Sequence, residues 1–138
     1  MRKIVLVSCV KSKLGKPAKA MFMYTSPLFR KNLHYATTLE PDRIFILSAK
    51  YGLLELQQII EPYEMTLNTM KEAEKKAWAK RVLHVLKTKT DLQNDHFVFL
   101  AGQNYRKYLI PCIKHFEVPF EGFSFGKQLQ ELNKRLDE

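Results

Sequence analysis

The sequence is poor in cysteine and has no pair of residues spaced for metal binding. Only two cysteines, Cys9 and Cys112, occur among its 138 residues, and neither belongs to a Cys-x-x-Cys motif. The four histidines are scattered rather than paired. This argues against a structural zinc site, and we expect no metal and no organic cofactor. Both cysteines have apolar sequence neighbours, which favours two buried thiols over a disulfide.

Membrane-spanning and secretory segments are also missing from the sequence. The longest apolar runs, such as residues 97–101, are far shorter than the roughly 20 residues that cross a bilayer. The basic start at Arg2 and Lys3 is followed by a short apolar run before polar residues return, unlike a signal peptide. These absences predict a soluble, cytoplasmic protein without a membrane partner.

Acidic residues are outnumbered by basic ones. The chain has 14 Asp and Glu against 23 Lys and Arg, a formal net charge of +9. Such an excess favours polyanionic partners, either nucleic acid or a phosphate-bearing nucleotide. A basic surface without a partner is the alternative, because charge alone is not specific. The sequence does not indicate the oligomeric state.

What the chain does contain is enough apolar side chain for one core. Hydrophobic residues make up 46% of the composition, and the length suits one α/β domain over residues 1–138. Continuous apolar runs at residues 3–9, 43–48 and 96–101 are typical of strands buried on both faces of a parallel sheet. A short fourth strand is predicted at 115–118.

Helical patterns alternate with these strands. Predicted helices follow Ser26-Pro27, a capping box at Thr69 and Glu72, and Ser124; a shorter one covers residues 105–113. The alternation predicts a Rossmann-like three-layer sandwich with a mainly parallel sheet of about four strands. Two long loops, residues 10–25 and 50–68, follow strands, at the sheet edge where such folds bind ligands.

Polar groups follow the first predicted strand. Lysines and hydroxyls directly after a strand suit an anion such as phosphate, although the spacing is not that of a P-loop. Cys9 is either a nucleophile activated by these lysines or, as we favour, a buried thiol at a strand end. The candidate ligand-binding residues of this segment are Ser8, Lys11, Ser12 and Lys13.

The second and third strands end in similar polar segments. A tyrosine there can stack on a base, amide side chains can read its edge, and glycines allow tight turns. Ordinary surface turns are the alternative interpretation. The candidate substrate-binding residues are Ser48, Lys50, Tyr51 and Gly52 after the second strand, and Gly102, Gln103, Asn104 and Tyr105 after the third.

Two carboxylates flank a tyrosine in the segment Glu61-Pro62-Tyr63-Glu64. A partly buried carboxylate here could act as a general base, or stabilise a cationic sugar transition state. Glu64 is the first candidate catalytic residue, Glu61 is the second, and Tyr63 is a candidate substrate-binding residue. Surface acids paired with lysines are the alternative.

These segments, together with Tyr24-Thr-Ser-Pro-Leu-Phe-Arg30 and Gly126-Lys-Gln-Leu129, resemble a family of small bacterial and phage domains, DUF6884. In the same order they are distantly similar to the uracil-DNA-glycosylase-like module of archaeosine synthase. That similarity implies a glycosylase-like α/β fold, a nucleobase-handling pocket and chemistry at an N-glycosidic bond. The glycosylase motif Gly-Gln-Asp-Pro-Tyr-His is absent, and Gly102-Gln-Asn-Tyr105 is its nearest match.

We therefore expect an enzyme that processes a nucleobase, nucleotide or nucleic acid, by N-glycosidic bond cleavage or base exchange. The alternative is a non-catalytic module that binds nucleic acid or a nucleotide, for example in phage–host conflict. A deep pocket beside Lys11, Tyr51 and Glu64 would favour the enzyme. A flat basic face would favour the binding module.

Overall fold

The computed structural model describes residues 1–8 and 13–137. Two 3-10 turns, η1 (Leu67–Thr69) and η2 (Ile110–Cys112), accompany the regular elements. In chain order these elements are β1 (Lys3–Ser8), β2 (Ala18–Lys19), α1 (Ala20–Met23), α2 (Pro27–Thr38), β3 (Arg43–Ser48), β4 (Gly52–Glu55), β5 (Ile59–Ile60), α3 (Glu72–Lys89), β6 (His96–Leu100), α4 (Gln103–Arg106), β7 (His115–Glu117) and α5 (Phe125–Leu136).

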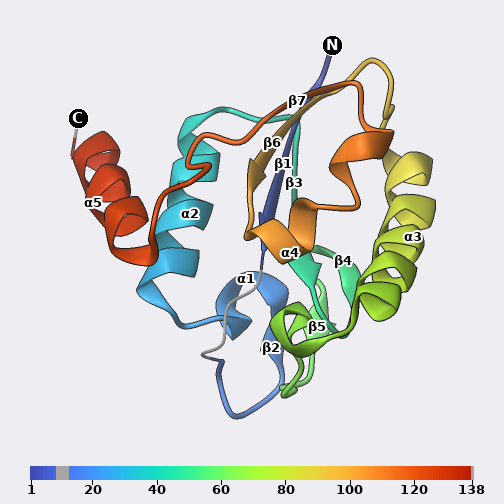
Figure 1. Ribbon diagram of the computed structural model, residues 1–138. Coiled ribbons are helices and arrows are strands. Elements are labelled where there is room, and N and C mark those ends of the chain that lie inside the picture. Colours follow the sequence, from blue (N-terminus) through green and yellow to red (C-terminus); the bar gives the residue numbers. More distant parts are fainter. Residues whose placement is uncertain (9–12, 138) are drawn as a thin grey trace.

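The main sheet has five strands in the order β4-β3-β1-β6-β7. The central strand β1 runs parallel to both β3 and β6, and β7 runs parallel to β6. The edge strand β4 is antiparallel to β3. The prediction of an α/β chain with a mainly parallel sheet is confirmed, with one strand more than expected. The carboxyl ends of β1, β3 and β6 therefore meet at one edge of the sheet (Figure 1).

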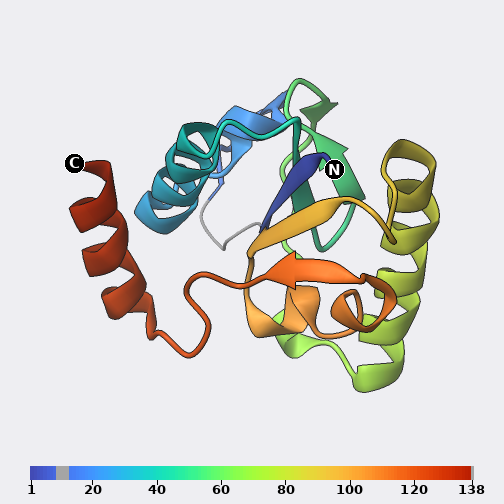
Figure 2. The same ribbon diagram turned by 90° about the horizontal axis from the view of Figure 1, so that it is seen from above.

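The continuous apolar runs form the centre of the core. Ile4 to Val7 of β1 are fully buried, because helices cover both faces of the strand. Val5 pairs with Ile44 of β3 and with Val98 of β6, which fixes the register. Figure 2 shows α2 and α5 on one side of this sheet and α3 on the other.

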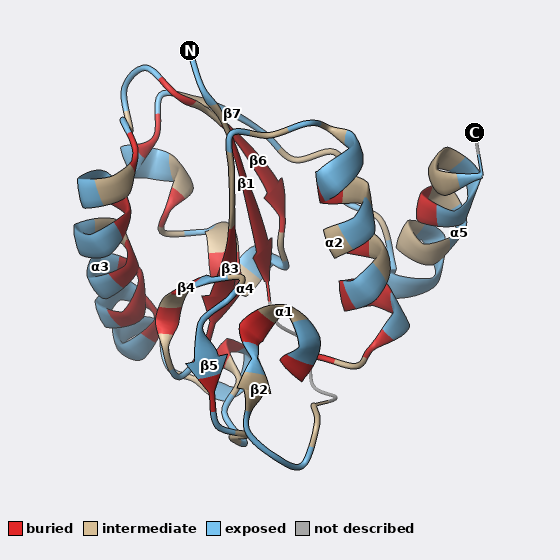
Figure 3. Ribbon diagram, turned by 180° about the vertical axis from the view of Figure 1, so that it is seen from behind, coloured by how far each residue is buried: buried red, intermediate tan, exposed pale blue. Residues whose placement is uncertain are grey.

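Serine side chains cap the first turns of two helices. Ser26 caps α2 as predicted, since its Oγ accepts a hydrogen bond from Leu28 N–H at 3.2 Å. Ser124 caps α5 in the same way, with Lys127 N–H as the donor. The helix α3 buries Trp78, Val82 and Leu86 against the sheet and exposes its opposite face (Figure 3).

Two predicted helix boundaries were wrong. The Thr69–Glu72 capping box does not form, because Thr69 belongs to η1; α3 begins at Glu72, and Glu74 accepts from Lys71 N–H instead. The helix expected over residues 105–113 is replaced by α4 and η2. Pro111 lacks the N–H that would continue the helix.

The cysteine and loop predictions also need correction. Cys112 is exposed rather than buried, because η2 lies at the surface; Cys9 lies outside the described residues. The two long segments predicted as loops contain short elements, and β2 pairs with β5 through Ala18 and Ile60. Among the helices in the described part of the chain, none combines the length and apolar character needed to span a membrane.

Candidate functional site

A cleft of about 1120 Å³ opens at the carboxyl ends of β1 and β6. Its walls come from α2, α5, α4 and the segment between β5 and α3. The lining residues are Ser8, Lys13, Leu28, Asn32, Tyr63, Glu64, Met65, Thr66, Asn68, Thr69, Met70, Glu74, Leu100, Ala101, Gly102, Tyr105, Phe125 and Gln128. The cleft therefore lies at the edge of the sheet where the two central parallel strands, β1 and β6, end.

The floor of the cleft is formed by the two strand ends. Ser8, at the end of β1, is buried, and its Oγ accepts a hydrogen bond from Gly102 N–H at 3.2 Å. This bond joins β1 to the turn that follows β6. The Arg106 side chain donates to the carbonyl of Ala101 at 2.7 Å, which holds the same turn from the other side.

A network of hydroxyl groups anchors the segment that carries Glu64. The Tyr63 hydroxyl lies 2.7 Å from the Tyr24 hydroxyl and 2.7 Å from Ser48 Oγ. Ser48 is fully buried at the end of β3, and its Oγ also accepts from Tyr51 N–H. The Lys13 ammonium lies 4.6 Å from the centre of the Tyr63 ring, a cation–π contact. Glu64 thus follows directly on a residue that is fixed to the sheet.

The far end of the same segment is attached to α4. Leu67 N–H donates to the buried Tyr105 hydroxyl at 3.3 Å, and Asn104 donates to Asn68 Oδ1 at 2.7 Å. The Tyr105 ring packs edge-on against Trp78 of α3, at 5.6 Å between ring centres. The segment is held at both ends, so its polar side chains are presented to the cleft on a fixed backbone.

Asn32 is the unusual residue of the cleft. It lies on α2 and is only 6% exposed, yet it lines the cavity. Its Oδ1 is fully enclosed and accepts no hydrogen bond from any residue that the structure describes. A desolvated acceptor without a donor costs about 1–3 kcal/mol. Such a group calls for an explanation, and a ligand that supplies the missing donor is one.

The charged groups of the cleft are few and of both signs. Glu64 and Glu74 contribute carboxylates, and Lys13 contributes an ammonium group. Glu74 is engaged by Lys71 N–H at the start of α3. Aromatic rings of Tyr63, Tyr105 and Phe125 lie in the walls, and Phe125 is 55% exposed. The cleft can therefore offer flat apolar surfaces, amide groups and a carboxylate to one ligand.

The structure brings six of the predicted site residues to the cleft lining, namely Ser8, Lys13, Tyr63, Glu64, Gly102 and Tyr105. Ser48 and Asn104 lie behind the lining and position it. Gln103 lines an adjacent hollow of about 380 Å³, which shares Leu100, Ala101, Gly102 and Gln128 with the cleft. Lys11 and Ser12 lie outside the described residues.

The other predicted residues do not line the cleft. Lys50 is exposed, Tyr51 hydrogen bonds through its hydroxyl to the backbone of Glu61, and Gly52 forms the start of β4. Glu61 is exposed and does not line the cleft either, and Glu64 is also exposed although it lines the cleft, so neither carboxylate is partly buried as expected. The end of β3 therefore does not form part of the cleft surface. It holds the cleft wall in place through the contact of Ser48 with Tyr63.

Sequence reasoning missed Asn32 and Gln128 as cleft residues. Asn32 stands on the apolar stripe of α2 with Leu28 and Ala36, where an amide is out of place, and that mismatch was the available signal. Gln128 donates to the carbonyl of Phe123 and lies one turn into α5. Nothing in its local pattern distinguishes it from a surface glutamine.

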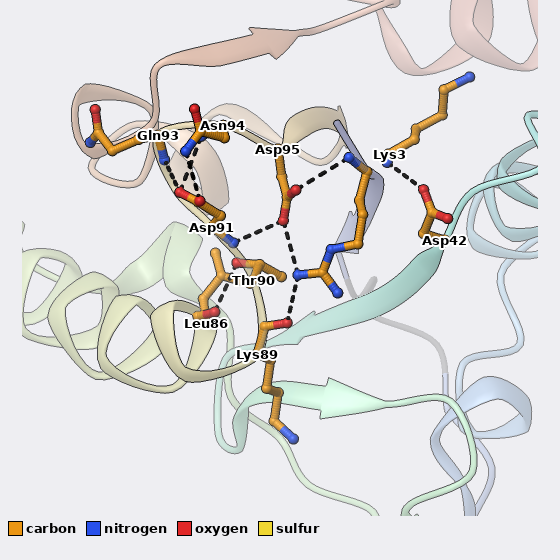
Figure 4. A network of polar contacts seen from close by, with 10 residues as sticks. Lys3, Asp42, Leu86, Lys89, Thr90, Asp91, Gln93, Asn94 and Asp95 are labelled. Carbon is orange, nitrogen blue, oxygen red and sulfur yellow. Dashed lines mark hydrogen bonds and ion pairs between the residues drawn. The ribbon is translucent and has the colours of Figure 1, made fainter.

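The opposite edge of the sheet has a polar cluster of a different kind (Figure 4). Asp95, only 4% exposed, accepts from the backbone N–H groups of Asp91 and Arg2 and from the Arg2 side chain. Burial alone would raise the pKa of Asp95, but these hydrogen bonds outweigh it and lower the pKa. Its carboxylate is fully satisfied, in contrast to Asn32, so this cluster has a structural role.

A metal site is not evident in the described residues, since no three His, Cys, Asp or Glu side chains gather there to hold an ion. No curated protein matches the chain. A family model matches residues 4–134, nearly the whole length of the chain. The protein is thus a member of DUF6884, a family of unknown function.

Proposed function

We propose that the cleft binds a nucleobase, and that the protein cleaves or exchanges the N-glycosidic bond that joins this base to its sugar. The observation that carries the proposal is the buried carboxamide of Asn32, whose oxygen has no donor among the described residues, in a cleft that also holds Glu64 and three aromatic rings. A base would supply the hydrogen bond that this oxygen lacks, and the rings would supply flat contact surface.

Asn32 would recognise the base through matching hydrogen-bonding groups. A carboxamide presents a donor and an acceptor side by side, and nucleobases present the same pair on their edges. Small side-chain rotations would let Asn32 Oδ1 accept from a ring or exocyclic N–H of the base. Tyr63, Tyr105 or Phe125 would stack on its face. Lys13, with Lys11 and Ser12 outside the described residues, would hold a phosphate group.

Glu64 supplies the carboxylate for the chemistry. In the hydrolytic form of the reaction, Glu64 accepts a proton from water, whose oxygen forms a bond to the anomeric carbon. The bond from that carbon to the base nitrogen breaks, and the base leaves with its electron pair and takes up a proton. The negative charge of Glu64 also stabilises the cationic character that the sugar develops.

The more detailed fold assignment belongs to the same proposal. Helices on both sides of a sheet with four adjacent parallel strands support a three-layer, Rossmann-like sandwich related to the uracil-DNA-glycosylase-like module (Figure 2). The position of the cleft at the carboxyl ends of these strands supports it further. In this chain Glu64 would replace the aspartate that the turn Gly102-Gln103-Asn104 lacks.

The test is turnover of a panel of nucleosides, nucleotides and oligonucleotides, with release of free base as the readout. We expect the Glu64→Gln variant to lose at least about 100-fold in rate, because a general base typically contributes that much. Glu61→Gln is the matched control, since Glu61 does not line the cleft, and it should retain the rate. Equal rates for wild type and Glu64→Gln on a cleaved substrate would contradict the assignment.

The non-catalytic alternative gives a different result in the same experiment. A binding module would retain nucleobase or nucleotide affinity, with Asn32 required, but would release no base from any member of the panel. The choice of enzyme here rests on Glu64, which lines the cleft beside the fixed Tyr63.

A further inference from the structure

The basic charge of the protein is densest on one helix, because residues 1–70, with ten basic and five acidic residues, carry no greater net charge over a much longer segment. Residues 71–89 contain seven lysines and arginines against two glutamates, whereas residues 90–138 contain six against seven. Within α3, no acidic residue follows Glu74. Four exposed residues, Lys76, Lys80, His84 and Lys87, recur at helical spacing on its outer face. We call Lys76, Lys80 and Lys87 the α3 ridge.

The carboxylates near the α3 ridge do not neutralise its positive charge. Glu72 is already occupied by Lys75, by Lys107 and by the Tyr108 hydroxyl. These hydrogen bonds, that of Tyr108 first, lower the pKa of Glu72 to about 2. Glu55 is likewise paired, with Arg43 and Lys89. In the described part of the chain, no carboxylate lies within ion-pair distance of a ridge lysine.

The helix that carries the α3 ridge starts at the cleft, although the ridge lies on a different side of the helix from Glu74. The first turn of α3 contributes Glu74 to the cleft lining, so the helix starts at the rim and runs away from it (Figure 1). From Lys76 to Lys87 the helix rises about 16 Å, at about 1.5 Å per residue. Beside its start lies the Tyr108 ring, with the ammonium groups of Lys76 and Lys107 at 5.5 and 5.2 Å from its centre.

We propose that the α3 ridge binds the phosphate backbone of a nucleic acid, so that the substrate of the cleft is a base within a polynucleotide rather than a free nucleoside. A row of uncompensated lysines matches a polymer with one charge per nucleotide. The Tyr108 ring beside two lysines suits the stacking and charge that single strands require. This inference rests on the proposed function for its target base, but the α3 ridge can be tested by itself.

A membrane surface fits the same charges less well. Helices that bind membranes insert an exposed apolar face between lipid head groups. The apolar face of α3 is instead buried in the core, through Trp78, Val82 and Leu86. Val85, at 37% exposure, is the large apolar side chain of α3 that reaches solvent.

The experiment measures affinity for a fluorescent single strand of about 20 nucleotides as a function of salt, where each phosphate contact contributes about 0.7 to the logarithmic slope. The test variant changes the three ridge lysines, Lys76, Lys80 and Lys87, to glutamine. The matched control removes the same charge elsewhere, through glutamine at Lys16, Lys19 and Lys134, which are exposed lysines on other segments.

We expect the ridge variant to lose about tenfold or more in affinity and to reduce the salt slope by about 2. The control variant should change both quantities much less. Equal losses in the two variants would overturn the ridge as a specific surface. Equal or tighter binding of wild type to phosphatidylserine vesicles or to polyglutamate would also overturn the assignment to nucleic acid. Thermal unfolding verifies that both variants are folded.

The Glu64→Gln variant separates this inference from the proposed function. It should bind the oligonucleotide with the wild-type salt slope, whether or not it has lost turnover. If wild type binds through the α3 ridge but releases no base from any substrate, the ridge inference is supported and the proposed chemistry is contradicted. If wild type releases base from nucleosides and the ridge variant is as active as wild type on oligonucleotides, the ridge inference fails alone.

Discussion

The Tyr63 hydroxyl lies 2.7 Å from Ser48 Oγ, and this contact joins the segment that carries Glu64 to the buried end of β3. The same hydroxyl lies 2.7 Å from that of Tyr24. One tyrosine therefore links the wall of the cleft to two elements of the core.

Tyr63→Phe tests that link. The variant leaves the Tyr24 hydroxyl and Ser48 Oγ each without one partner, so we expect a loss of about 1–3 kcal/mol in the free energy of unfolding. Urea denaturation measures it. In a double-mutant cycle, Tyr63→Phe should cost less once Ser48 is alanine, because the shared hydrogen bond is then already gone. Fully additive losses would contradict the link.

Asn32→Leu tests the cost of the buried amide oxygen that lacks a donor. Leucine has a similar volume and no acceptor to desolvate, so we expect the free energy of unfolding to rise by about 1 kcal/mol or more. Nucleobase binding should be lost in the same variant. This is the trade-off expected where a residue that serves binding lowers the stability of the protein. Urea denaturation and calorimetric titration measure the two effects.

Asn68→Leu is the matched control for this prediction. Asn68 also lines the cleft, but its Oδ1 accepts from Asn104. Because Asn68 is exposed, its replacement should leave stability unchanged or lower it slightly, and should not raise it. A loss of stability in Asn32→Leu as large as that in Asn68→Leu would mean that Asn32 is satisfied in the folded protein.

The ionisation of Asp95 should make the stability of the protein depend on pH. Its pKa in the folded protein lies below the ordinary value of 3.8, so folding favours the ionised form. Its contribution is full above that ordinary value and is lost as pH falls through the lower folded pKa. Asp95→Asn should cost about 1–3 kcal/mol at neutral pH, and the difference from wild type should shrink in strong acid.

Asp42→Asn is the control for Asp95. Asp42 accepts from Lys3 N–H at 2.7 Å, but it is exposed to solvent (Figure 4). Its replacement should cost much less, because water can satisfy the freed donor. The measurement is urea denaturation across the acid range, and a pH-independent difference for Asp95→Asn would contradict the assignment.

Gly52 is required by the turn that places Ser48 and Tyr51. Its φ of +74° lies in the left-handed region, and β4 begins there. Gly52→Ala should destabilise the protein by about 1 kcal/mol or more. Gly126→Ala is the matched control, because Gly126 lies within α5 with nothing near the added methyl group. It should leave the melting temperature unchanged or raise it. Equal effects in the two variants would contradict the role of the turn.

The central sheet could be predicted because its strands are buried on both faces. Residues 3–8, 43–48 and 96–100 form apolar runs that mark them as buried strands. The strand β4 was missed because Gly-Leu-Leu-Glu is too short to show an alternating pattern. The helix predicted over residues 105–113 was wrong because the apolar spacing there is helical, whereas Pro111 prevents a continuous helix.

The site could be predicted only at the level of the sheet edge. Parallel strands bring Ser8 and the segment after Leu100 together, and the cleft is there. Which of Glu61 and Glu64 lines it depends on how the segment turns around the fixed Tyr63, and no local pattern determines that. Asn32 comes from a helix whose apolar spacing predicts core packing, so only the tertiary structure places its amide in the cleft.

The most direct test of a nucleobase cleft is NMR detection of side-chain amides during titration with nucleobases and nucleosides. We predict that the Asn32 amide resonances shift saturably with added ligand. The Asn94 amide, which donates to Asp91 at the opposite edge of the sheet, should not move. A ligand that saturates the protein while the Asn32 resonances stay unchanged would contradict nucleobase binding in this cleft.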